Sequence, residues 1–307
     1  MINRVLIRLK VVQIIYAYYK NSGKSLKAAE DEMFFSLSKA YDLYSYLLLL
    51  MPGVTHYAAD RISFLSMKVR PTESDRNPNL KFVENRFIAQ LEQIEQLVKF
   101  SEKSKLNWVD NSDFLRRLLD KIEESDTYKE YMASGESSYA EDRELWRKLY
   151  KEFVFENEEL DDLIEEHSLY WNDDKAIVDT FVLKTIKRFS EDADSDTLLL
   201  PEYKDVADMD FARKLFRNAI ANADEYRKLM SESSKNWDMS RLAFMDVVIM
   251  QVALAELMTI SDIPASVTLN EYVEIAKHYS TAKSGPFVNG ILDTVVKTLR
   301  SAGKLDK

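Results

Sequence analysis

The sequence contains no cysteine and only six glycines and six prolines in 307 residues. Without cysteine there are no disulfides, thiolate metal sites or cysteine nucleophiles, and a reducing, cytoplasmic location is expected. The few glycines form neither a GxGxxG motif nor a Walker motif, so no recognisable nucleotide-binding loop is encoded. The histidines, His56, His167 and His278, are far apart, and none has the second histidine four residues away that a zinc-binding helix shows. We therefore predict no catalytic residue, no metal and no cofactor.

Long apolar runs are also missing. The longest block, "YLLLLMPGV" at 46–54, is far shorter than the ~20 residues that a membrane helix needs. Arg4, Arg8 and Lys10 interrupt the apolar N-terminal run, so a signal peptide is not expected. The sequence predicts a protein with no membrane partner.

What is abundant is leucine, glutamate, lysine and alanine, while the period-2 alternation typical of strands is scarce, so we predict an all-α fold. Residues 4–20 should form a helix packed between others, and 26–50 a second helix that ends at Pro52 and Gly53. No internal repeat is apparent. Thr268 and Glu271 read as a capping box that starts a helix, and Ser284 marks another helix start. Further helices are expected near 80–101, 111–132, 139–155, 173–190, 205–221, 222–232, 238–259, 268–279 and 284–299.

Charge is distributed unevenly along the chain. The formal net charge is -10, yet residues 1–50 carry 7 basic and 4 acidic side chains. Residues 51–204 carry 22 basic and 34 acidic side chains, and residues 205–307 carry 13 and 14. The acidity therefore belongs to the middle segment, which should repel phosphate at low ionic strength. For this middle segment we expect packing, dimerisation or another protein contact.

Two stretches could bind an anionic partner. Arg4 and Arg8 are four residues apart and project from one helix face, with Lys10 on another, so they could contact successive phosphates. Taken alone, ordinary surface charge is the better explanation, since a few cations on a helix are common. In "KSGPFVNG" (283–290), Lys283 precedes a helix whose N-terminus favours anions, and Phe287 could stack on a base. The alternative is a plain helix start with a buried Phe287.

Several motifs together resemble one known family. The stretch "IPASVTLNEYVEIAKHYSTAKSGPFVNGILD" (263–293) resembles the C-terminal signature of the NusB family of transcription antitermination factors. "DMSRLAFMDVVIMQVALAELM" (238–258) is similar to the long helix before it. "RLKVVQIIYAYY" (8–19) resembles the arginine-rich N-terminal helix of the family, with Gln13 and Tyr16 at the matching spacing. The resemblance covers about 1–50 and 205–300.

The resemblance implies a two-subdomain helical bundle, here with residues 51–204 as an inserted helical segment between 1–50 and 205–307. It implies a non-catalytic factor that binds boxA-type leader RNA together with the ribosomal protein NusE, in the transcription elongation complex on rRNA operons. Carried over by position, Arg4, Arg8, Lys10, Lys283, Ser284 and Phe287 would face RNA. Tyr16 would meet NusE.

The sequence departs from the family pattern in its first helix, where Val5 and Leu6 stand at positions that often hold arginine. Gly285 and Pro286 also replace more polar residues. A second hypothesis is therefore a helical interaction protein that has lost specific RNA binding. The same domain also occurs fused to rRNA cytosine methyltransferases, but a chain with no cysteine nucleophile and no glycine-rich methyl-donor motif does not fit methyl transfer.

Overall fold

The computed structural model describes residues 1–21, 23–104, 106–135, 138–233 and 242–307. Over these residues the chain is helical, with no strand and only an isolated bridge between Ile2 and Tyr203. This confirms the predicted all-α fold. The chain divides into two compact units: the first contains Met1 and 38–202, and the second contains 2–37 and 203–307.

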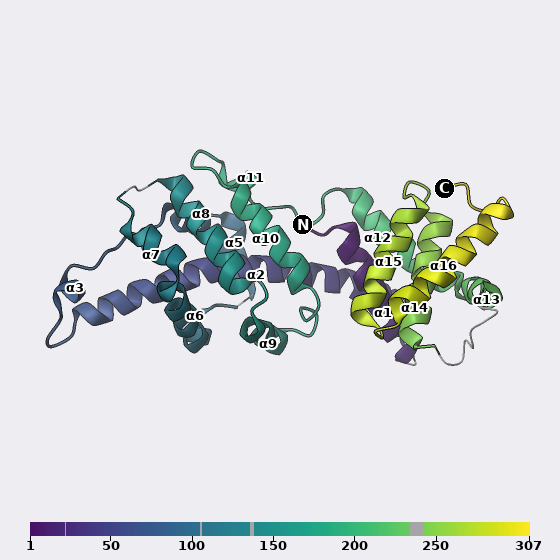
Figure 1. Cartoon of the computed structure of the whole chain (residues 1–307), viewed down its shortest axis with the longest axis horizontal. Coiled ribbons are helices and arrows are strands. Elements are labelled where there is room, and N and C mark those ends of the chain that lie inside the picture. Colours follow the sequence, from purple (N-terminus) through teal and green to yellow (C-terminus); the bar gives the residue numbers. More distant parts are fainter. Residues whose placement is uncertain (22, 105, 136–137, 234–241) are drawn as a thin grey trace. The chain divides into compact units, whose positions relative to one another are not determined.

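The second unit is a bundle built around one apolar helix (Figure 1). That helix, α14 (Phe244–Thr259), is apolar on nearly every side and is buried from Val248 to Leu257. A helix apolar all round requires neighbours on all sides, and α14 contacts five other helices. The helices of this unit are α1 (Arg4–Lys20), the first part of α2 (Leu26–Ser66), α12 (Val206–Ala221), α13 (Ala223–Ser233), α14, α15 (Ala265–Tyr279) and α16 (Ser284–Ser301).

Helix α1 packs between others, as its sequence predicts. Asn3 caps it by accepting a hydrogen bond from the backbone N–H of Leu6 at 2.9 Å. Nine of its residues are buried, including those outside the main apolar stripe. It contacts α12 and α14. Helix α14 begins at Phe244, and 238–241 of its predicted span lie outside the described residues.

The first unit consists of the rest of α2 and a set of shorter helices that cover its apolar side chains. They are α3 (Glu73–Arg76), α4 (Arg86–Glu92), α5 (Glu95–Ser104), η1 (Val109–Asn111), α6 (Ser112–Glu124), α7 (Asp126–Ala133), α8 (Tyr139–Leu149), the π-helical turn η2 (Tyr150–Val154), α9 (Glu158–His167), α10 (Lys175–Arg188) and α11 (Ser195–Leu198). Most helices predicted for 80–190 are therefore present, but several are divided by turns.

The prediction that α2 ends at Pro52 is wrong, because the helix continues to Ser66. Proline removes one backbone hydrogen bond, yet Pro52 is buried, and packing on α2 outweighs that loss. Gly53 lets Trp108 approach closely, since a Cβ at this position would lie 2.9 Å from the Trp108 Cβ. The Trp108 indole N–H donates to the carbonyl of Tyr46 at 2.9 Å, and the two rings stack 4.2 Å apart.

The predicted segments can be compared with these units. Residues 51–202 all lie in the first unit and 205–307 all lie in the second. The predicted segment 1–50 is divided between the units after Leu37, within α2. Helix α2 is thus part of both units, which a division at Pro52 did not anticipate.

Candidate nucleic-acid and protein interface

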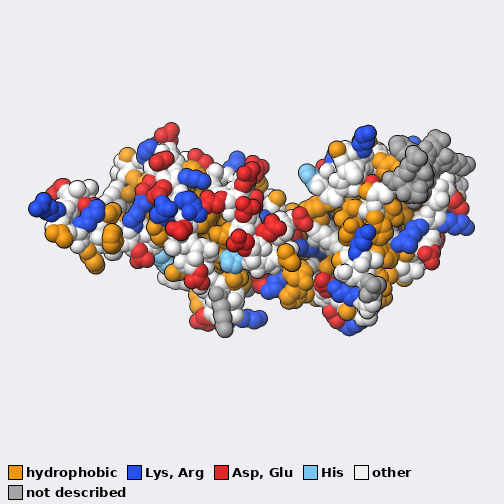
Figure 2. Space-filling model, turned by 90° about the horizontal axis from the view of Figure 1, so that it is seen from below, with side chains coloured by type: hydrophobic (Ala, Val, Ile, Leu, Met, Phe, Trp, Pro, Cys, Tyr) orange, Lys and Arg blue, Asp and Glu red, His pale blue; other side chains and the backbone are white. Residues whose placement is uncertain are grey.

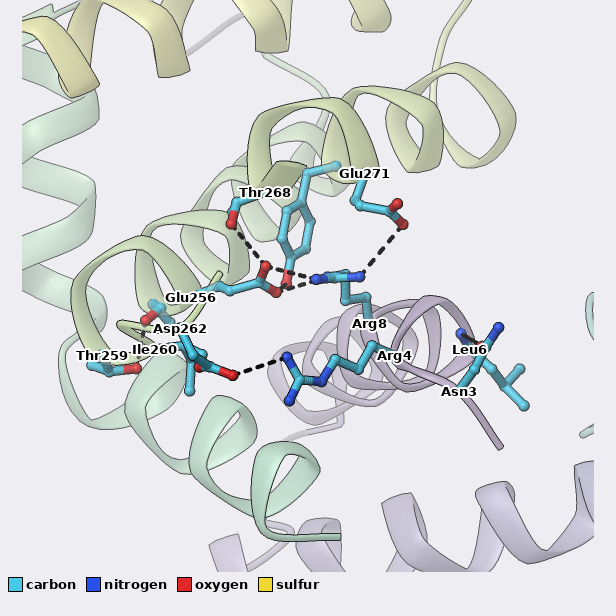
Figure 3. Close-up of polar contacts among 12 residues, drawn as sticks. Asn3, Arg4, Leu6, Arg8, Glu256, Thr259, Ile260, Asp262, Thr268 and Glu271 are labelled. Carbon is cyan, nitrogen blue, oxygen red and sulfur yellow. Dashed lines mark hydrogen bonds and ion pairs between the residues drawn. The ribbon is translucent and has the colours of Figure 1, made fainter. Parts of the chain in front are cut away.

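Arg8 lies inside the second unit, in a polar cluster between α1, α14 and α15 (Figure 3). Its Nε and Nη2 donate to the two carboxylate oxygens of Glu256 at 2.8 and 2.9 Å. Glu256 also accepts hydrogen bonds from the hydroxyls of Thr268 at 2.8 Å and Tyr272 at 3.0 Å. Arg8 is 3% exposed and Glu256 is 0% exposed. The predicted phosphate contact does not fit Arg8, because its guanidinium is buried and held by a carboxylate.

The electrostatics of this cluster favour the ion pair. Burial alone would lower the pKa of Arg8, but the hydrogen bonds and charge of Glu256, together with Tyr272 and Glu271, leave that pKa above its usual value. Burial, and then the charge of Glu256, raise the pKa of Tyr272 well above its usual value. The cluster therefore keeps Arg8 charged and the tyrosine protonated.

The predicted capping box at Thr268 and Glu271 is wrong, because both side chains belong to the cluster around Arg8. Helix α15 starts at Ala265, after Pro264, so Thr268 lies within the helix rather than at its start. Its hydroxyl donates to Glu256, and Glu271 lies 3.5 Å from Nη1 of Arg8. Both side chains make contacts with other helices, Thr268 with α14 and Glu271 with α1.

The other predicted cations of α1 differ from Arg8 in exposure. Arg4 is about one-third exposed, with Nη1 3.2 Å from Asp262 and Nε 3.8 Å from Asp208. Lys10 is buried, with 3% of its surface exposed. Of the predicted α1 cations, only Arg4 thus lies near the surface, and it is paired with acids.

The start of α16 is built as the sequence predicts, since Ser284 opens the helix. The Ser284 hydroxyl is buried and donates to the Asp246 carboxylate of α14 at 2.9 Å. This contact leaves Ser284 as a structural anchor rather than a surface ligand. Lys283, directly before it, is exposed. Phe287 is half-buried and lines a groove of about 730 Å³ with residues of α13 such as Leu229.

An aromatic cluster forms where the end of α1 meets the start of α14. Tyr16 and Tyr19 lie 5.5 and 6.1 Å from the ring centre of Phe244. The Lys20 ammonium lies 4.8 Å from the Phe244 ring centre, and the Arg227 guanidinium lies 5.0 Å from that of Tyr19. Cations held over aromatic faces in this way form a half-exposed surface that is both apolar and positively charged.

The structure does not bring all the predicted RNA contacts together. Arg4 meets Asp262, just beyond the C-terminal end of α14, whereas Ser284 meets Asp246 in its first turn. A helix rises about 1.5 Å per residue, so these contacts are about 20 Å apart along α14. Lys283 lies instead at the end of α14 that carries the aromatic cluster with Lys20. The sequence analysis missed Phe244 and Arg227, for which no local motif existed.

Charge separates the two units more sharply than it separates the predicted segments. The second unit carries 20 basic and 17 acidic side chains, a net charge of +3. The first unit carries 22 basic and 35 acidic side chains, a net charge of -13, and on its face in Figure 2 the two kinds are interspersed. An anionic partner is therefore attracted to the second unit and repelled by the first.

Comparison with known proteins matches part of each unit, since the matched residues begin within α10 of the first unit and extend through most of the second. A family model described as "NusB family" matches residues 177–297. A curated relative from Salinibacter ruber, named "Transcription antitermination protein NusB", is 33% identical over 132 residues, which span 41% of this chain and 82% of the relative. The chain belongs to the NusB family. Proteins of the same name from Chloroherpeton thalassium and Dictyoglomus turgidum are 38% and 41% identical.

The NusB relatives align with only part of the chain. The Chloroherpeton match spans 36% of this chain and about half, 53%, of the relative, and the Dictyoglomus match spans 31% and 66%. This NusB-family chain thus carries a large segment that the matches do not cover. No solved structure matches it.

The described residues show neither a metal-binding cluster nor a membrane-spanning helix. No group of three or more side chains of the metal-binding types lies close enough to hold an ion in the part of the chain that the structure describes. Within the same residues, no helix is long and apolar enough to cross a membrane.

Proposed function

We propose that this NusB-family chain is a non-catalytic, cytoplasmic transcription antitermination factor that binds boxA-type leader RNA together with NusE and so supports rRNA transcription. The observation that carries the proposal is the positively charged aromatic surface at one end of α14 in the unit that belongs to the family. The names of the relatives supply the process.

Within this proposal, RNA contacts the end of α14 that carries Lys20 and Lys283. Lys283 is exposed before the first turn of α16, where helix N–H groups favour anions. Phe287 offers a partly exposed ring for stacking. The contacts of Arg4 and Ser284 lie about 20 Å apart along α14. A single strand of about six stacked nucleotides, each advancing about 3.4 Å, would reach both. Arg8 and Lys10 are buried, and we assign them no RNA contact.

NusE binding is proposed for the surface around Tyr16. Tyr16 is half-buried, and its neighbours Tyr19 and Phe244 hold it in place. Aromatic side chains of this kind provide large contact areas at protein interfaces with little loss of side-chain freedom.

The experiment is ultraviolet crosslinking of boxA-type RNA to the full chain with NusE present, with a scrambled RNA of equal length as control. We expect crosslinked peptides that contain Lys20 and peptides from 283–290. Crosslinks confined to 38–202 would refute the placement. Absence of any difference between boxA-type and scrambled RNA would favour the second hypothesis, a factor that binds proteins only, which the burial of Arg8 and Lys10 supports.

A further inference from the structure

The first unit contains a set of helices arranged like part of the second. In the second unit the set consists, in chain order, of α1, α12, α13 and α14. In the first unit it consists of α4, α8 with η2, α9 and α10, and in both sets other helices lie between the first member and the second in the chain. Both first helices begin with Asn-Arg, in "NRVLIRL" (3–9) and "NRFIAQL" (85–91). Asn85 caps α4 by accepting from the Ile88 N–H at 3.1 Å, as Asn3 caps α1.

The next helix of each set carries a buried aspartate in its first turn that meets this Asn-Arg step. Asp208 of α12 lies 3.8 Å from the side chain of Arg4, and Asp142 of α8 accepts from the backbone N–H of Arg86 at 3.0 Å. When the aspartates are aligned, the buried positions of the two helices coincide. They are Leu145, Trp146, Leu149 and Tyr150 in one set and Phe211, Ala212, Leu215 and Phe216 in the other.

The correspondence continues to the end of each set. The same alignment places Leu160 and Ile164 of α9 on Tyr226 and Met230 of α13, all buried. Buried aspartates also occur near the start of the last helices, Asp179 in α10 and Asp246 in α14, one position apart in this alignment. Gln90, at the position of Arg8, donates to the carbonyl of Ser190 just beyond α10, much as Arg8 reaches Glu256 near the end of α14. From these matched positions we infer that 85–190 contain a diverged repeat of the core of the second unit, which was not apparent in the sequence.

A groove of about 680 Å³ lies in the first unit beside α4, between α2, α5 and the start of α6. Its apolar lining includes Phe64, Val98 and Val109, which are 72%, 42% and 78% exposed. Large apolar side chains so exposed, and grouped together, mark an interaction site. Small-molecule sites enclose most of their ligand, whereas these side chains remain open to solvent.

The repeat relates this groove to the candidate partner surface of the second unit. With Asn85 aligned on Asn3, Val98 takes the position of Tyr16 and Glu102 that of Lys20. The two positions line the groove, with the charge reversed. The positions matched by this offset, which crosses the break between α4 and α5, are therefore apolar and cationic in the second unit and apolar and anionic in the first.

The other charged groups of the groove preserve this negative sign. Asp60 and Glu102 are exposed, and within the described residues neither has an ion-pair partner. Glu92 contacts His56. Arg61, the cation of the lining, is held by two acids outside it, with Nη1 2.7 Å from Asp120.

We propose that this groove, beside a diverged second copy of the NusB-family core, binds a basic amphipathic helix of a protein partner. The lining residues of α2 run from Leu49 to Phe64, a length of about 22 Å, which a helix of about 16 residues spans. An apolar face on such a helix covers Val98 and Val109, and lysines or arginines on its flanks meet Asp60 and Glu102. RNA is disfavoured by the same charges.

The test uses fluorescein-labelled synthetic peptides of about 16 residues and the full chain. One peptide has leucines at helical spacing flanked by lysines; the second has the same leucines flanked by glutamates; the third is a scramble of the first. Anisotropy titrations compare wild type with Val98→Glu and with Glu102→Lys/Asp60→Lys. All three residues are exposed, and circular dichroism verifies that the variants fold.

We expect the basic peptide to bind wild type at least about tenfold more tightly than the acidic peptide or the scramble at low salt. Val98→Glu should weaken that binding, and Glu102→Lys/Asp60→Lys should shift the preference towards the acidic peptide. Equal binding of the basic peptide and the scramble, or no effect of the charge reversal, would overturn the proposal. So would sedimentation showing a wild-type dimer that Val98→Glu dissociates, since the occupant would then be a second copy.

Discussion

Replacing Glu256 with glutamine tests whether Arg8 is structural. In the wild type the two carboxylate oxygens of Glu256 accept four hydrogen bonds, two from Arg8 and one each from Thr268 and Tyr272. Glutamine keeps one acceptor oxygen, but it points an NH2 group at donors and removes the charge that faces the guanidinium. Arg8 would remain buried with the partly exposed Glu271, 3.5 Å from its Nη1, as its remaining countercharge.

The size of the effect follows from burial. Breaking a buried ion pair by removing one partner costs about 3–5 kcal/mol, because the remaining charge stays desolvated. Arg4→Ala is the matched control on the same helix, since Arg4 is about one-third exposed, its nearer partner Asp262 is exposed, and its contact with Asp208 is longer, at 3.8 Å. A pair of that kind contributes about 0–1 kcal/mol. The two substitutions should therefore differ by about 3 kcal/mol.

Hydrogen exchange measured by mass spectrometry is the appropriate assay. The chain has two compact units, so one global unfolding curve does not isolate the second unit. We expect faster exchange in α1, α14 and α15 for Glu256→Gln and little change for Arg4→Ala. Equal exchange in the two variants would refute the assignment of Arg8 to the core.

Two further predictions concern stability. Gly53→Ala places a Cβ 2.9 Å from the Trp108 Cβ. The cost of overpacking, about 1–3 kcal/mol, should exceed the gain in helix propensity of about 1 kcal/mol. A variant with a higher urea midpoint and unchanged tryptophan fluorescence would contradict this. Hydrogen bonding to Arg217 outweighs burial and lowers the pKa of Glu30, so this interaction stabilises the fold above about pH 4.3 and is lost as pH falls through the lowered pKa. Glu30→Gln should therefore be less stable than wild type at neutral pH, with the difference shrinking as pH falls through the lowered pKa, and a difference independent of pH would argue against the ion pair.

Helical periodicity predicts local structure well where a helix has a clear start. The burial of α1 on several sides and the opening of α16 at Ser284 both follow from the sequence and are confirmed. Tertiary contacts are different. Arg8 reads as a surface cation because its partner Glu256 lies 248 residues away. The spacing of Thr268 and Glu271 predicts a cap because it gives no information about the hydrogen bond from Thr268 to Glu256 of α14.

The match between 85–190 and the second unit is not apparent in the sequence, for a physical reason. The two copies of the core share buried positions rather than residue types, so Trp146 in one copy corresponds to Ala212 in the other. Packing requires apolar character at these positions and tolerates changes of size when neighbours compensate. Sequence identity therefore fades while the pattern of burial persists, and the inferred repeat rests on that pattern.

The most direct test of the RNA-binding proposal is a salt series of anisotropy titrations with fluorescent boxA-type RNA, alone and with NusE. Each phosphate contact contributes about -0.7 to the slope of log affinity against log salt on a single strand. The account predicts binding that NusE strengthens and a slope that Lys20→Ala/Lys283→Ala makes less steep by about 1.4. Binding with no salt dependence, or an unchanged slope in the double variant, would contradict it.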